Sequence, residues 1–256
     1  MAFNLNNFVI DRIIRAVGMS NQDDSVLFAI NQVTNASLNV TSETAEAVDA
    51  LGTPIAIFNR AKTAEFSAEN ALFDMNLMAV QAGSSKKVAA AGATIEVPMF
   101  EVMEGAELSK TPIGDVKFYT LSGDGSLGDA IVVSADGGED GGVVVDGKSV
   151  TGLPEGVQVM AVYEYNANGE DGNGAITVVN SAKDFPKACK LVLEILGCDV
   201  CNQEELIYAY LILPNFKISP DFDWSIATDG THPFSGQAMQ DYCDPNKVLY
   251  QLIIAE

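Results

Sequence analysis

Apolar and polar residues alternate with a short period along most of the chain. After residue 25, apolar residues recur largely at alternate positions in stretches such as 33–40, 55–57 and 64–68. Alternation of this kind is typical of half-buried β-strands, so these stretches predict strands. Residues 84–187 read as many short strands separated by turns rich in glycine, aspartate and asparagine, such as SGDGSLGD and NANGEDGNG.

Two segments have a helical period instead. Apolar residues at positions 8, 10, 13, 14 and 17 precede Gly18, which predicts a short N-terminal helical arm. A second helix is expected at Glu69–Ala82, because its apolar residues fall on one helical face and Gly83 provides a stop. The segment GQAMQDY, residues 236–242, suggests a further short helical turn.

These patterns predict a mainly β fold. Strands that recur about every 8–12 residues with such turns are typical of an antiparallel β-sandwich or barrel, here with one packed helix at about 69–82. We expect residues 1–95 together with 181–256 to form the β-sandwich core. Residues 96–180 are expected to form an inserted or elaborated β-rich region.

The net charge limits the classes of function that the chain can have. Among 256 residues, 35 acidic and 14 basic side chains give a formal charge of −21. Non-specific affinity for nucleic acid comes from lysine and arginine, so this acidity argues against a protein that grips DNA. No apolar run approaches the ~20 residues that span a bilayer, and the N-terminal sequence lacks the pattern of a secretory signal. We therefore expect a soluble protein made in the cytoplasm, with no membrane partner.

Catalytic motifs are missing from the sequence. The chain has one histidine, His232, in the turn-rich segment DGTHPFSG, where a polar loop residue is the expected role. No serine or cysteine nucleophile can be combined with it in a recognisable arrangement, and no G-x-S-x-G motif is present. The sequence therefore predicts a protein that is not an enzyme.

Cys198 and Cys201 have the two-residue spacing that zinc sites and redox motifs use. They are weak metal candidates, because only Cys189, His232 and Cys243 could complete a ligand set. The pair also follows a predicted strand and not the start of a helix, as a thioredoxin-like motif would require. We expect reduced thiols, with no metal and no cofactor.

Two blocks of the sequence resemble the tail-tube proteins of tailed phages. The block VTNASLNVTSETAEAVDALGTPIAIFNRAKTAEFSAENALFDMNLMAVQAGSSK has an "NASLNV" strand, a glycine turn at 50–52, a basic strand at 59–62, an aromatic strand at 64–66 and a helix. The block ILPNFKISPDFDWSIATDGTHPFSGQAMQDYC is similar to phage virion proteins with a P-x-F-K strand before a DG…PFSG-A segment. The resemblance covers residues 30–87 and 188–256.

The resemblance implies a structural virion protein located in the tail. Such subunits join their β-sheets into rings, usually hexamers, and the rings stack into a tube through which DNA passes without specific binding. Its partners would be further copies of itself and other tail or virion proteins. The acidity fits this role, because an acidic wall adheres poorly to DNA.

Two other classes of protein stay open. A capsid decoration or adhesion protein would also be β-rich and non-catalytic. A glycan-active enzyme would need a pair of carboxylates at a set separation, and no spacing among the 35 acidic residues selects such a pair.

Overall fold

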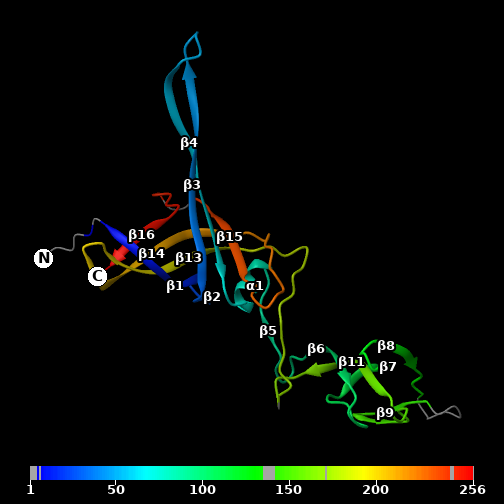
Figure 1. Ribbon diagram of the computed structural model, residues 1–256. Helices are drawn as coiled ribbons and strands as arrows, with labels where there is room; N and C mark the ends of the chain where they lie inside the picture. Colours follow the sequence, from blue (N-terminus) through cyan, green and yellow to red (C-terminus); the bar gives the residue numbers. More distant parts are fainter. Residues whose placement is uncertain (1–4, 6, 135–141, 171, 243–244, 256) are drawn as a thin grey trace. The chain divides into compact units, whose positions relative to one another are not determined.

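A computed structural model of the protein describes residues 5, 7–134, 142–170, 172–242 and 245–255. The chain divides into two compact units (Figure 1). Unit 1 comprises Met1–Lys86 and Val178–Glu256, and unit 2 comprises Lys87–Thr177. Each unit has its own hydrophobic core.

Unit 1 is built on one antiparallel sheet of eight strands, in the order β2-β1-β13-β14-β15-β4-β3, with β16 paired to β14 as well. One helix, α1, joins β4 to the second unit. The elements are β1 (Phe8–Ser20), β2 (Val26–Ile30), β3 (Val33–Val48), β4 (Pro54–Asn70), α1 (Met75–Gln81), β13 (Ala188–Asp199), β14 (Asn202–Ile218), β15 (His232–Ala238) and β16 (Gln251–Ala255).

The strands of the unit 1 sheet share one hydrophobic core. Alternate residues of β13 and β14 are buried, and they meet side chains from β2, β4, β15 and α1 in one cluster. Four buried phenylalanines contact one another edge-on or at a tilt, a geometry that aromatic pairs favour; they are Phe28, Phe66, Phe216 and Phe234.

The predicted N-terminal helix is wrong, because this segment is strand β1. The pairing of β1 with β13 skips Asp11 and Ile14, which are bulged residues. Each bulge lengthens the interval between side chains on one face from two residues to three. Ile10, Ile13 and Ala16 therefore share a face of the strand at a spacing that imitates a helix.

The predicted helix at 69–82 exists but is shorter. Glu69 and Asn70 belong to β4, and α1 begins after Asp74, whose side chain accepts hydrogen bonds from the N–H groups of Asn76 and Leu77. Such an N-cap fixes the start of a helix. Gly83 has a φ of +65° and follows the end of the helix, as expected. The helical turn expected at 236–242 is wrong in its first half, since Gly236–Ala238 end strand β15.

Unit 2 is a small β-structure. Its main sheet has the order β6-β11-β7-β8, all antiparallel, and two further pairs are β9 with β10 and β5 with β12. The buried side chains of the unit cluster on one face of the main sheet. The elements are β5 (Lys87–Val88), β6 (Ile95–Val102), β7 (Pro112–Leu121), β8 (Leu127–Ile131), β9 (Val144–Asp146), β10 (Ser149–Thr151), β11 (Gln158–Ala167) and β12 (Ile176–Thr177).

The expectation of a mainly antiparallel β protein with one packed helix is confirmed, and the sheets formed by the described strands do not close into a barrel. Within the described residues, α1 spans seven residues, and no helix is long and apolar enough to cross a membrane.

Candidate assembly surface

Four strands of unit 1 run side by side to one end of the sheet. They are the first part of β1 (Phe8–Arg15), the end of β13 (Glu194–Asp199), the first part of β14 (Asn202–Ile212) and β16. We call these four stretches the half-sheet. On one of its faces, Ile13, Ile195, Ala209 and Ile254 form a row across all four strands and pack on the core of unit 1.

Both lateral edges of the half-sheet are open. Strand β2 pairs with β1 only along Ala16–Met19, so Phe8–Arg15 have no outer neighbour among the described residues. Strand β16 is paired with β14 on one side, and no other described strand pairs with it. An edge strand has unpaired N–H and C=O groups that can bond to the strand of another chain. The half-sheet therefore offers two edges of this kind.

The face of the half-sheet that is turned away from the core has mixed charge. Arg12 contacts Asp11 at 3.0 Å, and Arg15 contacts Glu194 on β13 at 2.5 Å. Arg12 is opposite Leu196 of β13, and Leu196 is in turn opposite Tyr208 of β14, so the three residues form one cross-strand row. Both arginines of this face thus have carboxylate partners.

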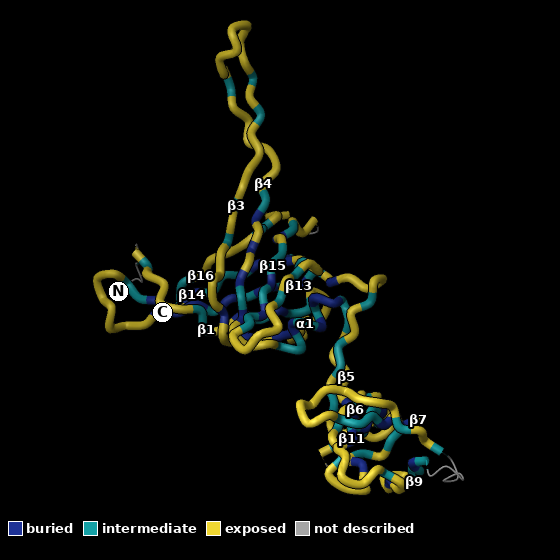
Figure 2. The backbone as a smooth tube through the Cα atoms, turned by 45° about the vertical axis from the view of Figure 1, so that its right-hand side comes forward, coloured by how far each residue is buried: buried dark blue, intermediate teal, exposed yellow. Residues whose placement is uncertain are grey.

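Strands β3 and β4 form a hairpin that is longer than the sheet it belongs to. Ala64–Asn70 pair with β15, but no third strand of the described chain pairs with residues 41–63. These residues, the hairpin arm, extend away from the rest of unit 1 as two exposed strands (Figure 2). The Oγ1 atoms of Thr41 and Thr63 lie 2.6 Å apart at the base of the arm.

The hairpin arm has more exposed apolar side chains than is expected of a two-stranded ribbon that is surrounded by water. Its exposed apolar residues include Leu51, 91% exposed, and Ile55, 70% exposed, together with Val48, Ile57 and Phe58. An isolated two-stranded ribbon is marginally stable in water, and exposed apolar groups of this extent are typical of contact surfaces. The arm has the composition of a segment that packs against another molecule.

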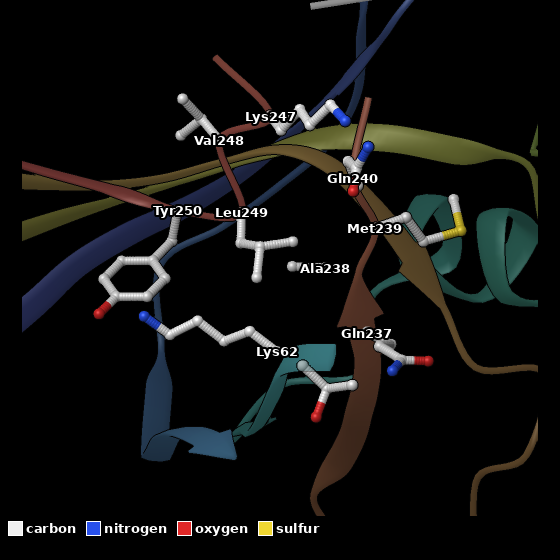
Figure 3. Close-up of a pocket in the computed structure, with 10 residues that line it drawn as sticks. Lys62, Gln237, Ala238, Met239, Gln240, Lys247, Val248, Leu249 and Tyr250 are labelled. Carbon is white, nitrogen blue, oxygen red and sulfur yellow. The ribbon is translucent and has the colours of Figure 1, made fainter. Parts of the chain in front are cut away.

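A cleft of about 740 Å³ lies where the hairpin arm leaves the sheet, beside the start of β16. Lys62 of β4 and Lys247 line it, and Figure 3 shows Leu249 and Ala238 between the two lysines. The side chain of Lys62 extends toward Tyr250 (Figure 3). Within the described part of the chain, neither lysine has a carboxylate within salt-bridge distance.

His232 is not a polar loop residue as expected, because it is fully buried at the start of β15. Its Nε2 lies 2.8 Å from Oε1 of Gln81 on α1, and its Nδ1 accepts a hydrogen bond from the N–H of Asp74 at 3.3 Å. Phe73 stacks on the imidazole, and Trp224 packs on Phe73. The histidine joins α1 to the sheet, and no nucleophile lies beside it in these contacts.

The cysteines lie in three different environments. Cys198 is at the end of β13, and Cys201 is exposed in the turn that follows, where its N–H donates to Asp199. Cys189 is buried in the core, and burial raises the pKa of its thiol to about 11. Cys243 lies outside the described residues. In the described part of the chain, no three His, Cys, Asp or Glu side chains are grouped to hold a metal.

A comparison with protein families finds one family whose model matches almost the whole chain. The model of the YomU/Tube protein family matches residues 8–252. The chain belongs to the YomU/Tube family. The resemblance to phage tail-tube proteins is thereby confirmed, and the family match runs through both units, including the residues of unit 2. No curated protein matches this YomU/Tube chain.

Proposed function

We propose that this YomU/Tube protein is the subunit of a phage tail tube, assembled from stacked rings that leave a channel for DNA. The observation that carries the proposal is the pair of open edges on the half-sheet. Strand β16 of one copy pairs with the Phe8–Arg15 edge of the next copy, and each copy leaves one edge of each kind free for a further neighbour. Such a head-to-tail contact generates a closed ring when the successive rotations between copies add up to one full turn.

Strand directions agree with this pairing. Along the half-sheet each strand is antiparallel to its neighbour, so β1 and β16 run in opposite directions. When all copies of a ring have the same orientation, β16 of one copy meets β1 of the next as an antiparallel pair. The bulges at Asp11 and Ile14 add bending and twist to β1, as the curved wall of a ring requires. The ring is a hexamer, the number that the resemblance to tail-tube proteins implies.

The channel lies on the face of the half-sheet that is turned away from the core, because the other face is covered by unit 1. Arg12 and Arg15 on this face are paired with Asp11 and Glu194. An arginine that is already paired with a carboxylate displaces few of the counterions bound to DNA phosphates. DNA therefore passes along this wall without being held.

Unit 1 alone forms the tube wall, since it contains both open edges and the hairpin arm. The arm packs against a neighbouring subunit, which buries its apolar side chains. The β-rich region expected at residues 96–180 elaborates the core expected at residues 1–95 and 181–256 and is not required for the tube wall. The protein acts without catalysis, is made in the host cytoplasm, and functions in the virion tail with other tail proteins as partners.

Electron microscopy of the purified full-length protein tests the proposal. Rings or tubes are expected, and class averages of end views count the subunits. A chain that stays monomeric at all concentrations and salt conditions would overturn the proposal. A monomer or trimer that binds preformed capsids would instead show a decoration protein.

A proline in β16 tests the edge pairing itself. Ile253→Pro removes an N–H from this edge strand and should abolish rings, while the thermal unfolding of unit 1 changes little because β16 is short and half-exposed. The matched control is Leu27→Pro on β2. Leu27 is a bulged residue on an edge strand that is not proposed to pair, so rings should persist. Rings of normal size from Ile253→Pro would exclude β16 as the contact.

A further inference from the structure

We propose that the cleft between Lys62 and Lys247 receives the β13–β14 turn of a second copy of the chain, an inference that rests on the proposed tube assembly. The two lysines flank a cleft whose floor is apolar, formed by Ala238, Leu249 and neighbouring side chains. Amide and hydroxyl groups complete the rim, from Gln237, Gln240 and Tyr250. Such a cleft is suited to an apolar tip flanked by carboxylates.

The β13–β14 turn has this composition. Val200 at its tip is 47% exposed, Asp199 directly precedes it, and Glu204 and Glu205 are among the first residues of β14. No lysine, arginine or histidine occurs between Lys190 and Lys217. The turn is therefore an apolar point within an acidic segment, complementary to the cleft.

Several contacts within the turn fix its shape. Asp199 accepts the N–H of Cys201 at 2.8 Å, and Asn202 donates to Glu205 at 2.9 Å. The N–H of Val200 donates to the carbonyl of Asn7 at 3.3 Å. A turn that is already ordered loses little conformational freedom when it enters a cleft. Glu204 has no hydrogen-bond partner among the described residues, so its carboxylate is available to a lysine of another copy.

The turn and the cleft lie at opposite ends of β14. Glu204 is near the first residue of the strand, whereas the cleft lies beside Ile212–Phe216, where β14 pairs with β16 and β15. Ile212 follows Glu204 by eight positions, which in a strand is a distance of about 26 Å. The two groups therefore cannot meet within one chain. A contact between copies uses the turn of one and the cleft of the next, and it repeats along a stack.

Zero-length carbodiimide cross-linking of wild-type assemblies tests the contact without any variant. Mass spectrometry should find Lys62 or Lys247 joined to Glu204 or Glu205. Assemblies whose lysines are joined only to other carboxylates would overturn the inference while leaving the tube function intact. A wild-type chain that is strictly monomeric would overturn both.

Charge reversal gives the second test. The double variant Lys62→Glu with Lys247→Glu should keep its rings but shorten tubes about tenfold, since like charges now face each other at the stacking contact. Adding Glu204→Lys and Glu205→Lys should restore tube length. The control variant Lys183→Glu with Lys187→Glu makes the same change in net charge at exposed lysines outside the cleft and should leave tubes unchanged.

The alternative is that the two lysines of the cleft bind DNA phosphates, and a DNA-binding assay distinguishes the two roles. Fluorescence anisotropy of a labelled DNA duplex is measured with wild type and with the Lys62→Glu, Lys247→Glu variant. The two curves should coincide. DNA binding that is lost with the two lysines, or tubes of full length from the charge-reversed variant, would overturn the inference.

Discussion

The imidazole of His232 and the amide of Gln81 form a buried hydrogen bond, with Nε2 of the histidine 2.8 Å from Oε1 of the glutamine. On the other side of the ring, Nδ1 faces the backbone N–H of Asp74, which can only donate. Nδ1 is therefore the acceptor, and Nε2 has the proton and donates to Gln81. The amide of Gln81 in turn donates to the carbonyl of Pro233 at 3.0 Å. These bonds join α1 to β15 and require a neutral histidine.

The first prediction is a loss of stability in acid that depends on His232. Burial lowers the pKa of this histidine below its ordinary value of 6.5, although the nearby Asp74 opposes the shift. The unfolded chain therefore binds a proton before the folded one does, so the stability is present above pH 6.5 and falls as the pH decreases below it. Urea unfolding across this pH range measures the slope.

The control for this prediction is His232→Asn, which keeps an acceptor for Asp74 and cannot be protonated. Since the chain has one histidine, the variant removes every histidine contribution to the pH dependence. Its slope just below pH 6.5 should be smaller than that of wild type. Equal slopes in the two proteins would show that carboxylates alone cause the acid sensitivity.

The second prediction concerns Gly18 in β1. A Cβ atom at this position would overlap the ring of Phe28, which is buried in the core of unit 1. Gly18→Ala should therefore lower the free energy of unfolding by about 1–3 kcal/mol, the usual cost of overpacking. Thermal or urea unfolding measures it. Gly105→Ala is the control, because nothing lies within 4 Å of a Cβ there; an unchanged stability of Gly18→Ala would mean that the Phe28 ring moves aside at no cost.

The sequence was sufficient for most of the strands, but not for β1 or for the pairing of strands with one another. Alternation in β13 reflects burial of one face, and it is visible because no register shift interrupts the pairing with β14 between Leu191 and Cys198. In β1 the bulges at Asp11 and Ile14 break the alternation, so the apolar spacing matched a helix. Strand pairing depends on contacts between residues that are distant in the sequence, and single-strand patterns have no information about them.

The candidate assembly surface was less accessible to sequence reasoning. The basic strand at 59–62 was recognised, but Lys247 is separated from Lys62 by 185 positions (247 − 62) and only the fold brings them to one cleft. His232 was expected in a loop because Pro233 and Gly230 flank it closely. Its burial depends on Phe73 and on Gln81 of α1, which are distant from it in the sequence, so no local pattern around the histidine indicates it.

The third prediction concerns Tyr163 in the core of unit 2. Its hydroxyl donates to Glu101 at 2.8 Å and accepts the N–H of Lys110 at 3.1 Å. Burial and the bond to Glu101 raise the pKa of Tyr163 to about 12. This contribution to stability is complete below the ordinary pKa of 10 and is lost as the pH rises toward 12.

Replacing Tyr163 by phenylalanine tests this network. Tyr163→Phe leaves the N–H of Lys110 without its partner and should cost about 1–3 kcal/mol of unfolding free energy. An ultraviolet titration of tyrosinate should also lose its most alkaline component. Tyr242→Phe is the control, since Tyr242 is 88% exposed and should change neither the stability nor that component.

The fourth prediction separates assembly from folding at the hairpin arm. Ile57 is 60% exposed and packs on no core residue, so Ile57→Lys should leave the free energy of unfolding unchanged within about 0.5 kcal/mol. In an assembled tube, however, the same lysine would be buried against a neighbouring subunit at a large desolvation cost. Tubes should therefore be absent or greatly reduced in electron micrographs of this variant.

Ile226→Lys is the matched control, because Ile226 is 89% exposed in a loop outside the arm and both open edges. Normal tubes from Ile57→Lys would mean that the arm does not contact a neighbour through this face, whereas loss of tubes from both variants would indicate an effect of added charge alone.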